Sequence, residues 1–251
     1  MTVALEQLLG SVDDNATGRT TTVLSPSTKT VTVGRGIVVG YYGYYGDITP
    51  SGVTDNLGNS YARVERVSLD TQAVADLWYA PVTSGGSITT ITVSHASTGY
   101  SGILAAEISG MAASAPAAGN GVAADSAALG YLIGIGDETI PAGGLAVWVG
   151  AGNAGVTHTV GAASGSPSTT PILDATSGSG GEFGSLSHAL SASEVTDFTG
   201  KTTCSDGASS TAGAGAIFAP AVTGPTNFLM LEDDSGAYEL EDGSGGIKLE
   251  S

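Results

Sequence analysis

Apolar and polar residues alternate along much of the chain in short runs that are separated by glycine, serine and proline. From Thr28 onward the segment TKTVTVGRGIVVGYYGYYG is rich in β-branched and aromatic residues, and its glycines divide it into two strands. Side chains alternate between the two faces of a strand, so one pair of these tyrosines is expected to face a core and the other the surface or an interface. Few windows have the spacing of three and four that an amphipathic helix requires. The pattern predicts an all-β protein.

Further strands are expected on both sides of two long loops. In GVTDNLGNSYARVERVSLD the residues DNLGN supply turn chemistry ahead of an alternating strand, which predicts a hairpin. The next strand, AVADLWYAPV, is expected to end at Pro81. Later strands are expected in ITTITVSHA, ILAAEISG, ALGYLIGIGDE, LAVWVGAG and GASSTAGAGAIFAPAV, the last of them running through Val222. The small-residue stretches 111–125 and 161–184 are interpreted as long surface loops.

Two terminal extensions are expected to lack a core of their own. Residues 1–25 are interpreted as an N-terminal arm with one short candidate helix, Val3–Leu9. Residues 226–251 contain a nine-residue repeat, LMLEDDSGA, YELEDGSGG and IKLES, which predicts three short strands. Isolated hairpins are only marginally stable in water, so this acidic tail is expected to pack on a partner, on a symmetry copy or on the β-sandwich formed by the rest of the chain. Residues 26–222 then form the β-sandwich domain.

Apolar side chains on extensions without a core need cover from another chain. The candidate interface residues are Leu5, Leu8, Leu9, Leu229, Leu231, Tyr238, Leu240, Ile247 and Leu249.

Composition and charge exclude several classes of partner. Charged residues make up 12% of the 251 residues, yet the formal net charge is −17, from 24 acidic residues against seven lysines and arginines. That balance argues against direct binding to DNA or RNA and suits a basic partner surface. The single cysteine, Cys204, excludes a disulfide framework within the chain. No apolar run approaches the roughly 20 residues of a spanning helix, and the start of the sequence lacks a signal-peptide pattern, so neither a membrane segment nor secretion is expected.

The sequence contains no recognisable catalytic or metal-binding motif. The three histidines are far apart and none has a metal-ligand spacing such as HExxH: His95, His158 and His188. Among the carboxylates, Glu107 with Asp137 or Glu138 is the one candidate acid and base pair. The acidic turns of the tail resemble calcium ligands but lack the glycine-rich calcium-binding repeat. We therefore expect no enzymatic activity, no cofactor and no metal.

Three segments together carry a resemblance to a known family: VTDNLGNSYARV, DLWYAPVTSGGSITTITVSH and GILAAEISG. They share a DxxGN turn, a Trp-x-Ala, a Gly-Gly hairpin and an Ala-Glu-x-Ser-Gly strand end. The series resembles jelly-roll-like β-sandwich domains of tailed-bacteriophage structural proteins, over roughly residues 28–220. The Leu-Glu-Asp-Gly-Ser-Gly tail is similar to endings found in phage proteins.

The resemblance implies a jelly-roll-like antiparallel β-sandwich that serves as a capsid decoration, or cement, protein. Such a protein would be made in the cytoplasm of the host bacterium and would reside on the capsid surface of the virion. Its partners would be the major capsid protein and copies of itself, with which it would form a homotrimer at threefold positions. It would stabilise the head by contacts with neighbouring capsid subunits.

Two alternatives from other classes are open at this point. The first is an adhesion or carbohydrate-binding module of a tail or fibre, which would stack surface glycans on Tyr41, Tyr45, Tyr100 or Trp78. The second is a secreted hydrolase on the same fold, which would need two convergent carboxylates in a cleft.

Overall fold

The computed structural model of the protein describes residues 2–14, 19–44, 50–69, 73–96, 99–112, 115–124, 131–153, 158–164, 172–177, 182–204 and 210–221. In these ranges the chain forms nineteen strands and no helix. Every strand pair in them is antiparallel. All of these residues belong to one of the two units of the chain, Met1–Ala221. The prediction of an all-β, antiparallel sandwich is confirmed.

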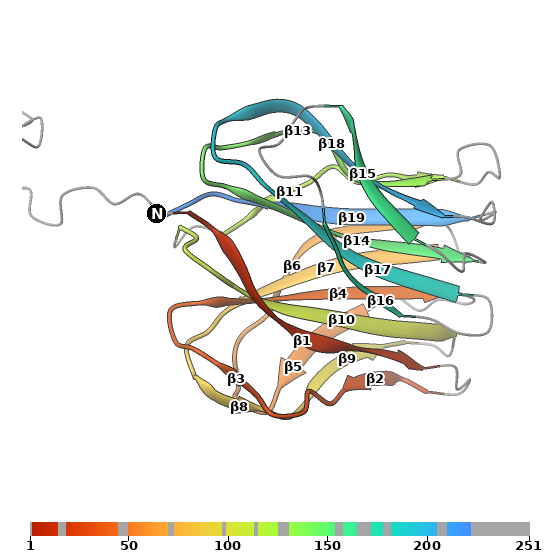
Figure 1. Ribbon diagram of the computed structural model, residues 1–251. Coiled ribbons are helices and arrows are strands. Elements are labelled where there is room, and N and C mark those ends of the chain that lie inside the picture. Colours follow the sequence, from red (N-terminus) through yellow and green to blue (C-terminus); the bar gives the residue numbers. More distant parts are fainter. Residues whose placement is uncertain are drawn as a thin grey trace, which may run out of the picture. The chain divides into compact units, whose positions relative to one another are not determined.

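The first ten strands make up the N-terminal half of this unit (Figure 1). Their bounds are Ala4–Asp14 (β1), Thr21–Leu24 (β2), Lys29–Val31 (β3), Gly36–Tyr44 (β4), Pro50–Asp55 (β5), Ala62–Leu69 (β6), Ala73–Pro81 (β7), Gly86–Ile88 (β8), Ile91–His95 (β9) and Tyr100–Ser109 (β10).

The remaining nine strands make up the C-terminal half. Their bounds are Ala117–Ala118 (β11), Ala123–Ala124 (β12), Tyr131–Ile140 (β13), Leu145–Asn153 (β14), His158–Ser164 (β15), Ile172–Ser177 (β16), Glu182–Leu190 (β17), Val195–Cys204 (β18) and Thr211–Phe218 (β19).

Two large sheets pack face to face in the middle of the unit, and we call them the inner sheets (Figure 1). Inner sheet 1 has the strand order β1-β10-β4-β7-β6, and inner sheet 2 has the order β11-β19-β14-β17-β16, with β12 also paired to β19. Outer sheet 1, β2-β9-β5, covers the other face of inner sheet 1. Outer sheet 2, β13-β18-β15, covers the other face of inner sheet 2. The strands are therefore stacked in four layers.

Each of the three spaces between layers holds an apolar core. The core between the inner sheets combines Leu104 and Ile108 of β10 with Val147 of β14 and Phe218 of β19, none of them more than 2% exposed. Burying such a side chain stabilises the fold by about 1.5–3 kcal/mol. The other two cores lie under the outer sheets and contain Trp78 and Trp148, respectively. Because the central strands of both inner sheets are covered on both faces, β4, β14 and β19 consist almost entirely of small and apolar residues.

Glycine and alanine allow the layers of the C-terminal half to approach closely. All eight residues of β19, TAGAGAIF, are buried. A Cβ atom on Gly213 would collide with the carbonyl of Ile133, and one on Gly134 would collide with Trp148. The Trp148 side chain fills the space beside Gly134, and its indole donates a hydrogen bond from Nε1 to Thr202 Oγ1 at 3.2 Å. The glycine content of the sequence is thus partly a packing requirement.

The two halves have the same strand order. In each inner sheet the first strand pairs with the last, the last pairs with a central strand (β4 or β14), and that strand pairs with β7 or β17. The short strands β11 and β12 both pair with β19 and together take the place of β1. In each outer sheet the next strand of the half pairs with the penultimate one, β2 with β9 and β13 with β18. The short ribbon β3-β8 has no counterpart among the described residues of the C-terminal half. This repetition was not predicted from the sequence.

Several predicted elements are corrected by the structure. The candidate helix Val3–Leu9 is wrong, because all of this segment but Val3 lies in β1. Strand β1 pairs with β10 and belongs to inner sheet 1, so it is not a separate arm. The predicted hairpin around DNLGN is also wrong: β5 pairs with β9, whereas β6 pairs with β7. The stretch 161–184 is not one long loop, since it contains β16 and parts of β15 and β17.

Candidate functional site

Glu107, the glutamate of the Ala-Glu-x-Ser-Gly strand end, has a fully buried side chain on β10. Its carboxylate accepts hydrogen bonds from the Thr32 main-chain nitrogen at 2.7 Å, from Gln7 Nε2 at 2.8 Å and from the Arg35 guanidinium at 3.1 Å. Arg35 also forms an ion pair with Glu6 at 3.2 Å. A buried carboxylate is tolerated only when it is paired and hydrogen-bonded in this way. Glu107 therefore ties β1 and the turn after β3 to β10.

The structure does not bring Glu107 together with its two suggested partners. Asp137 accepts a hydrogen bond from Thr199 Oγ1 at 2.8 Å, and Glu138 accepts one from the Asn120 side chain. Both residues lie on β13 in outer sheet 2, whereas Glu107 lies in inner sheet 1. The three carboxylates are engaged at separate places and do not form an acid and base pair.

A second buried carboxylate, Asp76 on β7, is held by two arginines of β6. Arg63 Nε donates to Asp76 Oδ1 at 3.1 Å, and the Arg66 guanidinium donates to Oδ2 at 2.7 Å. Both guanidinium groups also donate to the Pro50 carbonyl, at 2.5 and 2.8 Å. Burial raises the pKa of Asp76 to about 6, although Arg66 and Arg63 oppose the rise. Arg63 also stacks over Trp78, 4.6 Å from the ring centroid.

A third carboxylate connects the two halves. Glu65 projects from β6, the edge strand of inner sheet 1, and accepts hydrogen bonds from the main-chain nitrogens of Gly121 at 2.8 Å and Gly215 at 2.5 Å. Burial raises the pKa of Glu65, and these backbone donors oppose that rise. The edge of one inner sheet is thereby fastened to β19 of the other.

The DNLGN turn, which contributes to the family resemblance, is held together by a network of hydrogen bonds. Asp55 Oδ1 accepts from the main-chain nitrogens of Leu57 at 2.9 Å and Asn59 at 3.1 Å, and Asp55 Oδ2 accepts from the Tyr61 hydroxyl at 2.9 Å. Asn59 Oδ1 in turn accepts from the Thr83 nitrogen at 3.0 Å. The turn is thereby bound to the chain that follows β7, which explains why Asp and Asn are needed at these positions.

Among the histidines, His95 has the most completely described surroundings. It is 4% exposed, and its Nε2 lies 3.2 Å from Thr22 Oγ1, which in turn lies 2.5 Å from Ser101 Oγ. His188 is also buried, and the side chain of His158 lies outside the described residues. The described part of the chain contains no group of three or more His, Cys, Asp or Glu side chains that could hold a metal ion.

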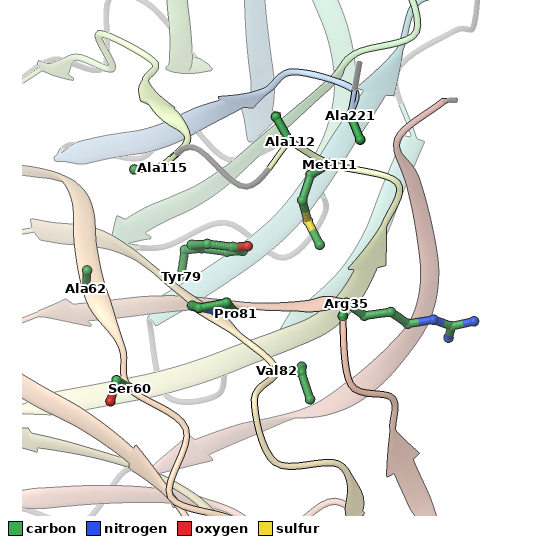
Figure 2. A pocket seen from close by; sticks show the side chains of 11 residues that line it. Arg35, Ser60, Ala62, Tyr79, Pro81, Val82, Met111, Ala112, Ala115 and Ala221 are labelled. Carbon is green, nitrogen blue, oxygen red and sulfur yellow. The ribbon is translucent and has the colours of Figure 1, made fainter. Parts of the chain in front are cut away.

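A surface pocket of about 560 Å³ lies where the strands β10 and β19 end (Figure 2). Tyr79 forms one wall and packs edge-on against Phe218, with ring centroids 5.5 Å apart. Met111, Pro81 and Val82 also line it, together with several small residues and the polar residues Arg35 and Ser60. The pocket is thus a mainly apolar hollow without convergent catalytic groups among the residues that line it.

The predicted interface residues have different outcomes. Leu9 is 1% exposed and packs under outer sheet 1, so the prediction that it contacts another chain is wrong. Leu5 and Leu8 are half-buried and pack against the core between the inner sheets. Six residues of the tail lie outside the described residues: Leu229, Leu231, Tyr238, Leu240, Ile247 and Leu249.

The aromatic faces suggested for glycan binding are mostly inaccessible. Tyr41 is fully buried and Trp78 is 6% exposed, so neither can stack on a sugar at the surface. Tyr100 is half-buried, and Tyr45 lies outside the described residues.

Sequence reasoning missed Arg63, Arg66 and Asp76 as a cluster. The signal that could have found it is a lone aspartate in the apolar run AVADLWYA, because an isolated carboxylate in a buried strand needs a cationic partner.

Comparisons of the chain with protein-family models, with curated proteins and with solved structures find no match. Within the described ranges, no helix is long and apolar enough to cross a membrane.

Proposed function

We propose that the chain is a structural component of a bacteriophage virion, most specifically a capsid decoration protein. It stabilises the head by surface contacts with neighbouring capsid subunits and assembles with copies of itself as a homotrimer. This proposal starts from the resemblance of VTDNLGNSYARV, DLWYAPVTSGGSITTITVSH and GILAAEISG to the β-sandwich domains of phage structural proteins. The order of strands in each half, with the first strand beside the last in one sheet and β2 or β13 beside the penultimate strand in the other, suits the jelly-roll part of that resemblance.

The main support for the proposal is that the polar residues of the resembling motifs form hydrogen bonds within the scaffold. Asp55 and Asn59 of the DNLGN turn bind main-chain nitrogens, and Glu107 of the Ala-Glu-x-Ser-Gly strand end binds Arg35 and a main-chain nitrogen. These side chains hold segments of the scaffold in place. A motif whose polar groups are engaged in this way favours a structural role over a catalytic one.

The charge of the chain supports the same proposal. With a formal net charge of −17, the protein suits a basic partner surface, and many copies would remain soluble at high local density. Electrostatic attraction of this kind raises the rate of association and weakens as salt is added.

A rebinding experiment tests this function. Capsids of the phage that encodes the chain, prepared without it, are mixed with the purified full-length protein and sedimented. We expect the protein to sediment with the capsids at a fixed ratio, to raise their temperature of disruption and to have the mass of a trimer in solution. A stable monomer that stays in the supernatant at low salt would refute the proposal.

A further inference from the structure

The equivalence of the two halves extends to individual residues. In inner sheet 1, Gly36 of β4 pairs with Pro81 of β7 and Ile108 of β10. In inner sheet 2, Leu145 of β14 holds the corresponding place and pairs with Leu190 of β17 and Phe218 of β19. None of these four ladders contains a bulge. Each residue of β4 is therefore equivalent to the residue of β14 that lies the same number of positions after Leu145 as it lies after Gly36.

The turns before β4 and β14 repeat the same backbone hydrogen bonds. In the first half, Gly34 donates to the Val82 carbonyl at 3.1 Å, and Val82 donates to the Arg35 carbonyl at 2.8 Å. The second half has the equivalent bonds, from Gly143 to Ser191 at 2.7 Å and from Ser191 to Gly144 at 3.1 Å. Two halves that agree in strand order, ladder register and turn bonding are two versions of one sandwich.

The contacts between the inner sheets follow the same equivalence. Strand β7 packs on β14 and β19, and its equivalent β17 packs on β4 and β10. Strand β6 packs on β19, and its equivalent β16 packs on β10. If every strand is replaced by its equivalent in the other half, the contacts of β6 and β7 become those of β16 and β17. The halves are therefore related by an internal two-fold axis, as the subunits of a symmetric dimer are.

This axis passes between β4 and β14, where Gly40 meets its own equivalent, Val149. A Cβ atom on Gly40 would lie 3.0 Å from both Cβ and Cγ2 of Val149. A symmetric dimer would place two identical residues at this point. The chain instead has the smallest residue on one side and a β-branched residue on the other.

We propose that the inner face of each half is a self-complementary docking surface, and that the partner it fits is a copy of the same sandwich. Unequal residues on the two inner faces restrict the pairing to one N-terminal half with one C-terminal half. The chain is then a dimer fused into one polypeptide. This inference does not depend on the proposed function.

Pairing of two C-terminal halves is disfavoured at the axis. Such a pair would place Val149 against a second Val149, in a space that here holds one valine and a glycine. Overpacking of this kind forces side chains or backbone to move.

Pairing of two N-terminal halves is disfavoured by Tyr42. Its ring packs against Gly184 of β17, so closely that a Cβ atom on Gly184 would collide with it. The residue equivalent to Gly184 is Ala75 of β7, since Tyr42 pairs with Ala75 and Ala151 pairs with Gly184 in the two ladders. In a pair of two N-terminal halves, the Ala75 methyl group would take the place of Gly184 and collide with Tyr42.

Exchange of the axis residues in the full-length chain is the first test. Gly40→Val and Val149→Gly are each expected to lower the midpoint of urea unfolding, the first by overpacking and the second by leaving a cavity. The double variant Gly40→Val/Val149→Gly exchanges the two residues across the axis and is expected to recover most of the combined loss. The control Gly40→Val/Val147→Gly changes the same residue types without that exchange, and its losses are expected to add. Additive losses in the Gly40/Val149 variant would overturn the assignment of the axis.

Selective pairing is tested by cutting the folded full-length chain at a protease site inserted between Ala112 and Ala115. Native mass spectrometry is expected to show that the two pieces stay together one to one. After unfolding and refolding of the cut protein, only mixed pairs are expected. Pieces that separate on cutting, or like pairs as abundant as mixed ones after refolding, would overturn the proposal.

Discussion

The carboxylate of Glu65 on β6 accepts a hydrogen bond from the main-chain nitrogen of Gly215 on β19, at 2.5 Å. The other oxygen of the same carboxylate accepts from the Gly121 nitrogen at 2.8 Å. A single side chain from the N-terminal half thus satisfies backbone donors of the C-terminal half. Its loss leaves partly buried N–H groups without their charged acceptor.

Replacement of Glu65 by glutamine keeps the size of the side chain and removes its charge. Because hydrogen bonds to charged groups contribute about 1.5–3 kcal/mol, we expect Glu65→Gln to lower the free energy of unfolding by about 2 kcal/mol at pH 7. Urea unfolding followed by tryptophan fluorescence measures the loss. Glu194→Gln, at an exposed position, is the matched control and is expected to change stability by less than about 0.5 kcal/mol. Equal stability of both variants would mean that Glu65 does not fasten the halves.

Asp76 predicts a dependence of stability on pH. Its pKa in the folded state is about 6, above the ordinary value of 3.8, so the folded protein binds a proton that the unfolded chain has released between these values. The stability that this proton contributes is fully present below about pH 4 and is lost as the pH rises through about 6. It amounts to about 3 kcal/mol, at 1.36 kcal/mol for each pKa unit.

The measurement compares the wild type with Asp76→Asn in urea unfolding from pH 4 to pH 7. The stability advantage of the wild type over Asp76→Asn is expected to shrink as the pH rises, because the variant lacks the titrating group. An advantage that grows over this range would show that the two arginines lower the pKa of Asp76 more than burial raises it.

Asn59 is expected to stabilise the DNLGN turn more than its neighbour Asn56. Asn59 is 5% exposed, and its side-chain oxygen accepts hydrogen bonds from Thr83 and Ser84 nitrogens, both at 3.0 Å. Asn59→Ala leaves these donors unsatisfied and is expected to cost about 2 kcal/mol. Asn56→Ala removes similar bonds at an exposed position, where water replaces them, and is expected to cost about 1 kcal/mol or less. Thermal unfolding of both variants measures the two losses of stability. A larger loss in Asn56→Ala than in Asn59→Ala would contradict this prediction.

The close approach of β13 and β19 makes Gly213 intolerant of a side chain. A Cβ atom there meets the Ile133 backbone, so Gly213→Ala is expected to lower the free energy of unfolding by about 1–3 kcal/mol. Gly52→Ala is the control, because a Cβ atom on Gly52 meets no other atom within 4 Å. We expect Gly52→Ala to be neutral or slightly stabilising, since alanine restricts the unfolded chain. Similar melting temperatures for the two variants would contradict the packing described for β13 and β19.

Strands with β-branched and aromatic residues were predictable from the sequence, whereas strands stabilised mainly by their neighbours were not. The segment EFGSLSHAL has few strong strand formers, yet it forms β17 because β14 and β16 pair with it on both sides. Conversely, VALEQLL has the spacing of a helix, but from Ala4 onward it belongs to β1, which pairs with β10. Val3 and Leu9 are buried in two different cores. Tertiary context overrides local preference in both cases.

The polar sites could be predicted only in part, for a related reason. Asp76 and Glu107 each stand alone in an apolar run, and this marks them as buried carboxylates in need of partners. Which residues supply those partners depends on strand order. Arg35 reaches Glu107 only because β4 lies beside β10, and Glu65 reaches Gly215 only because the two inner sheets pack face to face.

The location of the chain in an intact particle tests the proposed function most directly. Cryo-electron microscopy of the virion is expected to show the double sandwich on the outer surface of the head, in regular copies at threefold positions of the capsid lattice. Density for the chain in the tail or a fibre, or its absence from the particle, would contradict the assignment as a capsid decoration protein.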